Sequence, residues 1–174
     1  MNEIRYKQIG LIHSPYKEPN GTPIQPTAAK GVEGTVEVFS EYAEGLKNIE
    51  GFSHIMLIYH FHLVKGVSLM VKPYMDDNLR GIFATRAPPR PNPIGLSIVR
   101  LIKVDGNTLH ILDVDVVDGT PLLDIKPYVP EFDSRKVEKT GWLEKRVGRL
   151  HKVKDNGRFV KKEKINMNDR ELRS

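Results

Sequence analysis

Two long runs of β-favouring residues, joined by Asp105-Gly106, constrain the fold of this chain more than any other feature. Residues 94–104 (IGLSIVRLIKV) and 107–117 (NTLHILDVDVV) are rich in branched aliphatic side chains. An Asp-Gly pair between two such runs is a strong signal for a tight β-hairpin. Residues 33–39 (EGTVEVF) alternate as a strand does. The chain is therefore expected to consist mainly of strands, several of them linked by hairpins.

Two more segments are predicted to be strands. Residues 4–12 (IRYKQIGLI) alternate imperfectly, and residues 54–64 (HIMLIYHFHLV) are almost all apolar or aromatic, as in a strand buried on both faces. A short helix is expected over 41–48, capped by Ser40. Because closure removes exposed edges, we expect a small closed or nearly closed β-barrel with few short helices. A doubly wound α/β fold would need a helix after each strand.

The charges divide the chain into two parts. Residues 1–134 contain 13 Lys and Arg against 16 Asp and Glu, whereas residues 135–174 contain 14 against 6. We expect a β-barrel domain over the first part and a short basic C-terminal extension over the second. In the extension, 146–153 and 158–162 are predicted to form a β-hairpin around Asp155-Asn156-Gly157. A basic block suggests a polyanion partner such as RNA, and a solvated tail is the alternative.

Composition excludes or disfavours several kinds of site. The chain has no cysteine, which excludes disulfides, thiol nucleophiles and thiolate zinc sites. His60 and His62 form an H-x-H pair, but we expect no metal site because a third ligand is missing. No run approaches the roughly 18 apolar residues of a membrane span, and the N-terminus lacks a signal-peptide stretch. A cytoplasmic protein without a membrane partner is therefore expected.

Two long loops rich in proline and glycine, residues 15–31 and 72–93, are expected to be functional. In the second, four prolines within residues 88–93 stiffen the backbone that presents Arg86 and Arg90. Two guanidinium groups on a stiff loop can bind a phosphate or a carboxylate. The alternative is a polyproline ligand for an SH3-like partner, because A-P-P-R-P-N-P contains P-x-x-P.

Asp113 and Asp115 are predicted to lie two residues apart on one face of the strand 107–117. Like charges at that spacing are unfavourable unless a cation or a donor lies between them. A metal, Lys126 or a cationic ligand could lie between the two carboxylates. Alternatively, one of the two aspartates lies at the solvated rim of the barrel. Asp118 opens the sequence D-G-T-P, which is typical of a turn.

Four stretches resemble the TsaA/TrmO family of tRNA methyltransferases, over roughly residues 6–134. They are I-G-L-I-H-S-P-Y-K (9–17), G-F-S-H (51–54), F-A-T-R with R-P-N-P-I-G-L-S (83–86 and 90–97), and the run from Asp115 to Pro121 with D-I-K-P-Y (124–128). The resemblance implies an S-adenosylmethionine-dependent enzyme on a small β-barrel that acts as a homodimer. The implied substrate is the threonylcarbamoyl-adenosine beside the tRNA anticodon, methylated at its exocyclic nitrogen. Consistent with it, no strand is followed by the G-x-G-x-x-G fingerprint of Rossmann methyltransferases.

The resemblance also implies a cofactor site. In it Arg86 would pair with the cofactor carboxylate, Asp115 would accept hydrogen bonds from the adenosine or the ammonium group, and leucines would enclose the adenine. The residues of this site are Gln25, Pro26, Thr27, Ala28, His62, Leu63, Arg86, Leu96, Leu112, Asp113, Val114 and Asp115.

Catalysis and substrate binding would fall to other residues of the same motifs. Asn92 and Asp118 are the candidates for orienting the carbamoyl group and handling its proton. Substrate binding is expected from Arg90, Lys126 and Tyr128. The tail could contact the RNA backbone beside the anticodon loop through Lys152, Lys154, Arg158, Lys161, Lys162 and Lys164.

The sequence leaves three functions open. Besides a tRNA methyltransferase, a non-catalytic RNA-binding β-barrel and a methyltransferase acting on a different acceptor remain. The role of the tail is open as well, since Trp142 and Val147 could instead pack it onto the barrel.

Overall fold

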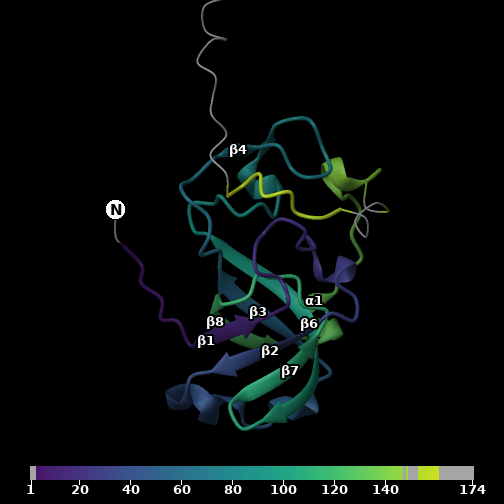
Figure 1. Ribbon diagram of the computed structural model, residues 1–174. Coiled ribbons are helices and arrows are strands. Elements are labelled where there is room, and N and C mark those ends of the chain that lie inside the picture. Colours follow the sequence, from purple (N-terminus) through teal and green to yellow (C-terminus); the bar gives the residue numbers. More distant parts are fainter. Residues whose placement is uncertain (1–2, 147, 149–152, 161–174) are drawn as a thin grey trace, which may run out of the picture.

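Six strands form a closed barrel in the computed structural model, which describes residues 3–146, 148 and 153–160 (Figure 1). Around the barrel the order is β1-β2-β7-β6-β3-β8, and every neighbouring pair is antiparallel. The mainly β barrel predicted from the sequence is therefore confirmed. The strands are β1 (Gly10–His13), β2 (Glu33–Val38), β3 (His54–His60), β6 (Ile94–Asp105), β7 (Thr108–Leu112) and β8 (Thr120–Pro127).

The remaining elements within the described residues are short. Strands β4 (Met70–Val71) and β5 (Arg80–Gly81) form a separate two-stranded sheet. One turn of α-helix and five 3₁₀ segments complete the set: α1 (Pro130–Asp133), η1 (Pro26–Ala28), η2 (Ser40–Leu46), η3 (Ile49–Gly51), η4 (Ile82–Ala84) and η5 (Gly141–Leu143). No helix in the described part of the chain is long and apolar enough to cross a membrane.

Alternate strand residues fill the barrel interior, because successive side chains of a strand point to opposite faces. Strand β3 shows the pattern clearly, with Ile55, Leu57 and Tyr59 buried and the residues between them half-buried. Burying one aliphatic side chain of this kind contributes about 1.5–3 kcal/mol to the free energy of unfolding. The core side chains that are at most 2% exposed are Ile12, Val36, Val38, Ile55, Leu57, Val99, Leu109, Ile111, Val114 and Leu122.

The hairpin predicted around Asp105-Gly106 is confirmed. Strands β6 and β7 pair with Asp105 opposite Thr108, and Gly106 has a φ of 59°. Glycine adopts this left-handed conformation without a steric cost, as tight hairpin turns require. This hairpin supplies two adjacent barrel strands.

Three predicted elements have different limits or character. The strand expected over 4–12 begins only at Gly10, because its neighbours pair with residues 10–13 alone, and Ile4 is 74% exposed. The strand expected over 54–64 ends at His60 and has one fully buried face rather than two. The helix expected over 41–48 is the 3₁₀ segment η2, which starts at Ser40, and no side chain caps it.

Strand β7 ends five residues before the predicted limit of residue 117. Asp113 takes a left-handed φ of 72°, which breaks the alternation after Leu112. Its carboxylate binds Arg100 at 2.9 Å and accepts a hydrogen bond from the Gly31 amide at 2.6 Å. The prediction that Asp113 and Asp115 share one strand face is therefore wrong, and Arg100 rather than a shared cation balances Asp113.

Strand β8 was not predicted from the sequence. Pro121 and Pro127 stand near its two ends, and proline disfavours a strand because it cannot donate to the ladder. Pro121 nevertheless lies opposite Leu11 of β1, and Ile125 lies opposite Leu57 of β3. The strand closes the barrel between β1 and β3.

One end of the barrel is covered by a cap, defined here as residues 14–32, 61–93, 141–146 and 153–160. Figure 1 shows the tail, coloured yellow, running beside the loops that carry β4. The Trp142 indole donates to the Ala84 carbonyl oxygen at 2.8 Å, and Phe159 packs on Val71, Ile82 and Ala87. The Asp76 side chain, only 2% exposed, pairs with Arg80 and with Arg146 of the tail. The tail is thus built into the cap.

The predicted tail hairpin lies largely outside the described residues, as do Val147, Lys152, Lys161, Lys162 and Lys164. Of the described tail residues, Lys154 forms an isolated antiparallel β-bridge with Pro23 of the first loop. Arg158 lies over the Tyr74 ring and donates to the Lys72 and Pro73 carbonyl oxygens. Arg158 therefore has a structural role in the cap.

Candidate active site

A cavity of about 910 Å³ lies between the end of the barrel and the cap. The barrel contributes Tyr59 and Leu96, the loops contribute Gln25 and Arg86, and the tail contributes Trp142. A volume of this size is at the upper end of the range for small-molecule sites, about 300–1,000 Å³. Three separate parts of the chain thus meet around one cavity.

The structure brings seven of the twelve predicted cofactor residues to the wall of this cavity: Gln25, Thr27, His62, Leu63, Arg86, Leu96 and Asp115. Pro26 and Ala28 belong to the same 3₁₀ segment as Thr27 but do not line the cavity. Leu112 ends strand β7, Asp113 binds Arg100, and Val114 is part of the barrel core. These last three residues support the wall from outside.

Opposite charges face one another inside the cavity. Arg86 donates a hydrogen bond to the Gln25 side-chain oxygen at 2.8 Å, which joins two residues 61 positions apart. The Arg86 guanidinium also lowers the pKa of Asp115, although burial is the larger influence on that group. A cation and a carboxylate in one cavity suit a ligand that carries both charges, such as an amino acid.

Arg90 lines the same cavity as Arg86, but one nitrogen of its guanidinium binds the surrounding loop. Its Nη1 donates to the Ile82, Thr85 and Ala87 carbonyl oxygens at 3.1, 2.9 and 3.4 Å. The guanidinium also lies 5.8 Å from the centre of the Phe83 ring. Arg90 therefore orders the loop around η4, including the backbone beside Arg86.

Asp115 ends a chain of buried hydrogen bonds that sequence reasoning missed. Ser97 Oγ donates to Asp115 Oδ1 at 2.6 Å, and Tyr59 Oη lies 3.0 Å from Ser97 Oγ. Burial raises the pKa of Asp115 to about 7, against the opposing effects of the Ser97 hydrogen bond and the Arg86 charge. A serine within the apolar run I-G-L-S-I-V was the available signal.

His62 lies in the same wall. Burial and the neighbouring His60 lower the pKa of its imidazole, so the neutral form is favoured near pH 7. Among the residues that the structure describes, no group of three or more His, Cys, Asp and Glu side chains could hold a metal ion.

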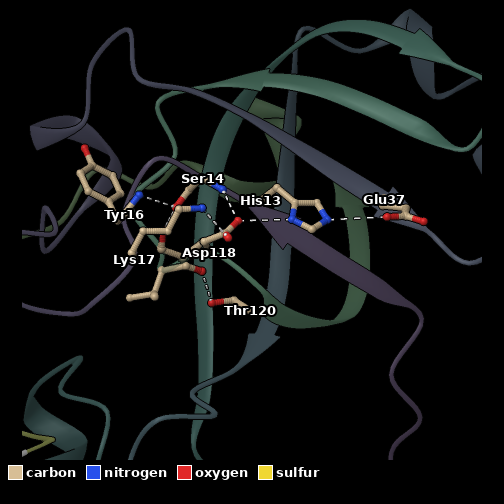
Figure 2. Close-up of polar contacts among 9 residues, drawn as sticks. His13, Ser14, Tyr16, Lys17, Glu37, Asp118 and Thr120 are labelled. Carbon is tan, nitrogen blue, oxygen red and sulfur yellow. Dashed lines mark hydrogen bonds and ion pairs between the residues drawn. The ribbon is translucent and has the colours of Figure 1, made fainter.

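Asp118 lies outside the cavity wall, in a cluster of polar side chains at the start of the first loop (Figure 2). Its Oδ2 binds Lys17 Nζ at 2.7 Å, while Oδ1 accepts from the Ser14 amide at 3.1 Å and contacts His13 Nδ1 at 3.3 Å. The pKa of Asp118 is lowered, and the hydrogen bond from Lys17 is the main cause. These contacts fasten residues 13–17 to the turn before β8.

Asn92, Lys126 and Tyr128 also lie outside the cavity wall. Asn92 is exposed in the turn before β6, and its carbonyl oxygen accepts from the Ile94 amide. Lys126 pairs with Asp124 at 2.8 Å on β8, and the Tyr128 ring packs edge-on against His54. Arg90 alone of the three predicted substrate residues lines the cavity.

Comparison with known proteins gives matching results from sequence and structure. Residues 11–134 match the family described as tRNA-methyltransferase O N-terminal domain. A probable S-adenosyl-L-methionine-binding protein of Pyrococcus abyssi is 64% identical over 156 residues, covering 90% of this chain and 85% of the relative.

Two further relatives have named activities. The tRNA (adenine(37)-N6)-methyltransferase of Escherichia coli is 40% identical over 144 residues, covering 77% of this chain and 61% of the relative. The crystal structure of TrmO from Pseudomonas aeruginosa superposes with a TM-score of 0.68 at 36% identity, covering 81% of this chain and 63% of that one. The chain thus spans less than two thirds of both of these proteins.

Proposed function

Because the chain belongs to the TrmO family of tRNA methyltransferases, we propose that it methylates the exocyclic N6 of a tRNA adenosine with S-adenosylmethionine as donor. The observation that carries this proposal is the cavity at the end of the barrel. Its wall combines a guanidinium, a carboxylate and apolar side chains, from the residues that the family resemblance assigns to the cofactor.

The wall fits the chemistry of S-adenosylmethionine. Arg86, held by Gln25, is placed to bind a carboxylate, and the Asp115 carboxylate suits the positive charge of the ligand. Leu63 and Leu96 offer apolar surface to an adenine ring. When bound, the cofactor supplies an activated methyl group, so the protein is left to bind, orient and exclude water.

We further propose that the acceptor is the threonylcarbamoyl-adenosine at position 37, beside the anticodon. The activity of the Escherichia coli relative, named for adenine 37, supports this position, and the cavity volume supports an acceptor that enters together with the cofactor. Asn92, exposed in the turn before β6, remains the candidate for orienting the carbamoyl group. For Asp118, whose oxygens are occupied by Lys17, Ser14 and His13, we propose a positioning role for the first loop.

The chain is also proposed to act as a homodimer in the cytoplasm, where tRNA is found. Phe83, Ile94 and Leu96 line the cavity and are 76%, 37% and 45% exposed. Apolar surface of this kind at the rim of a site favours covering by a second protein surface. A second copy there would exclude water from the cavity.

The experiment that tests the function is methyl transfer in vitro, read by mass spectrometry of the tRNA nucleosides. The substrates are a tRNA that carries threonylcarbamoyl-adenosine and the same tRNA without the modification. The proposal expects a gain of one methyl group on the modified nucleoside only. Methylation of neither tRNA, with S-adenosylmethionine still bound, would favour a methyltransferase on a different acceptor, and no cofactor binding would favour an RNA-binding barrel.

A further inference from the structure

Three aspartate and histidine side chains lie in the wall of the cavity: Asp115, Asp155 and His62. Asp155 accepts from the Gly157 amide at 2.6 Å, and its backbone pairs with Thr22, so its contacts serve the turn of the tail. His62 has a pKa lowered by burial, which makes its imidazole a weaker base. Asp115 is therefore the remaining candidate for a proton acceptor in the cavity wall.

Among side chains of the described residues, Ser97 alone donates to the Asp115 carboxylate. Ser97, which is 1% exposed, donates to Oδ1 at 2.6 Å. Within the described residues no side chain donates to Oδ2, and Asp115 is half-buried with its open part in the cavity wall. A ligand in the cavity can therefore meet Oδ2 while Oδ1 stays fixed.

The hydroxyl groups of Tyr59 and Ser97 form a chain of hydrogen bonds that ends at Asp115. When Asp115 is ionised, the Ser97 hydroxyl donates to it, so the Tyr59 hydroxyl is the donor to Ser97 Oγ across 3.0 Å. The Tyr59 ring lies over Gly95, where a Cβ would collide with it. Both hydroxyl protons thus point toward Asp115, and neither hydroxyl can take a proton without reversing the chain.

We propose that Asp115 Oδ2 removes the N6 proton of the acceptor adenosine during methyl transfer, and that Ser97 and Tyr59 position this carboxylate. The inference rests on the proposed function. The N6–H bond breaks and its proton moves to Oδ2, the nitrogen electron pair forms the new bond to the methyl carbon, and the electron pair of the broken S–C bond stays on sulfur. Asp115 then returns the proton to solvent.

The surroundings of Asp115 tune it for this task. Tyr59, Tyr16 and the Arg86 guanidinium are all close enough to interact with its charge, and burial is the main cause of its raised pKa of about 7. A general base works best when its pKa is near the operating pH. A cationic ligand in the cavity would favour the ionised form further, which prepares the base when the methyl donor is bound.

The first test measures protons rather than activity. Binding of S-adenosylmethionine at pH 7 is followed by calorimetry in two buffers of different ionisation enthalpy. With a pKa of about 7, Asp115 is partly protonated there, so the wild type is expected to release up to about half a proton more than Asp115→Asn. The control Asp105→Asn, at the far end of β6, keeps the wild-type release. Equal release by wild type and Asp115→Asn overturns the proposal.

The second test compares single-turnover methyl transfer with cofactor affinity. In Asp115→Asn the rate is expected to fall at least about 100-fold, with the dissociation constant of S-adenosylmethionine changed less than about fivefold. A rate within tenfold of an active wild type overturns the inference and leaves the proposed function intact. Loss of affinity in proportion to rate would mean that Asp115 acts through cofactor binding alone, and it also overturns the inference. A wild type without methyl transfer refutes the proposed function itself.

Ser97→Ala tests the positioning role. Removing the hydrogen bond that lowers the pKa of Asp115 should move the acidic limb of the rate–pH profile to higher pH. An unchanged limb with a uniformly lower rate would show that Ser97 serves packing alone and would overturn its part in the proposal.

Discussion

The barrel is stabilised mainly by apolar packing, whereas the cap is stabilised mainly by polar contacts. The barrel has a continuous apolar core, in which Ile55, Leu57 and Leu122 are fully buried. The cap has only a small apolar cluster around Val71 and Ile82, and depends otherwise on polar contacts between distant segments. The cavity lies where the two meet, so its barrel wall is fixed by packing and its cap wall by contacts that are easier to break.

This difference separates two tasks of the site. Asp115, the proposed base, is hydrogen-bonded to Ser97 of β6, which in turn contacts Tyr59 of β3. The residues proposed to bind the amino-acid part of the cofactor, Gln25 and Arg86, both belong to the cap. A rigid support keeps a reactive group in the geometry that the reaction needs, whereas a wall made of loops can open for substrates and products.

Leu57→Ala should have the largest effect on stability, because it removes a fully buried side chain from the barrel core. We expect the free energy of unfolding to fall by about 3–5 kcal/mol. Urea denaturation followed by far-ultraviolet circular dichroism measures it. A loss below about 1 kcal/mol would show that the barrel core is not the main source of stability.

Asp115→Asn should stabilise the protein in a pH-dependent way. The raised pKa of Asp115 means that the folded protein holds the proton while the unfolded chain, with an aspartate pKa of 3.8, has released it. The contribution of Asp115 to the free energy of unfolding of the wild type is therefore fully present below about pH 4 and is lost as the pH rises to about 7. Relative to wild type, the variant should gain at most about 4 kcal/mol at pH 8 and almost nothing at pH 4. Denaturation at the two pH values checks this, and an equal difference at both would contradict a raised pKa.

Phe159→Ala should have a smaller effect that is confined to the cap. Phe159 is half-buried against Val71, Ile82 and Ala87, so we expect a loss of about 1–2 kcal/mol. Hydrogen exchange should become faster in residues 68–90 and remain unchanged in strands β3 and β6. Faster exchange in the barrel strands would show that cap and barrel unfold as one unit.

The sequence predicted the barrel better than the cap for a physical reason. Strand patterns such as E-G-T-V-E-V and the Asp105-Gly106 turn depend on neighbouring residues, and both were confirmed. Strand β8 was missed because Pro121 and Pro127 disfavour a strand locally, and only pairing with β1 and β3 stabilises it. The early end of β7 was missed because the left-handed Asp113 depends on its contact with Arg100.

The site was predictable where motifs mark it and not where distant segments meet. The motif resemblance named Gln25, Arg86 and Asp115, which the structure brings to one cavity. It gave no sign of Trp142, because the tail reaches the cavity only through long-range contacts such as the one between Arg146 and Asp76. The role of Arg90 was also hidden, since its carbonyl partners depend on the fold of the η4 loop.

Trp142 offers the most direct measurement of the central claim that barrel, loops and tail together form the cofactor cavity. It is the only tryptophan of the chain and lines the cavity from the tail. Titration with S-adenosylmethionine should change the intrinsic fluorescence of Trp142, with a midpoint equal to the dissociation constant from calorimetry. Calorimetric binding without any change in Trp142 emission or quenching by iodide would contradict the account, because the cofactor would then bind away from the tail.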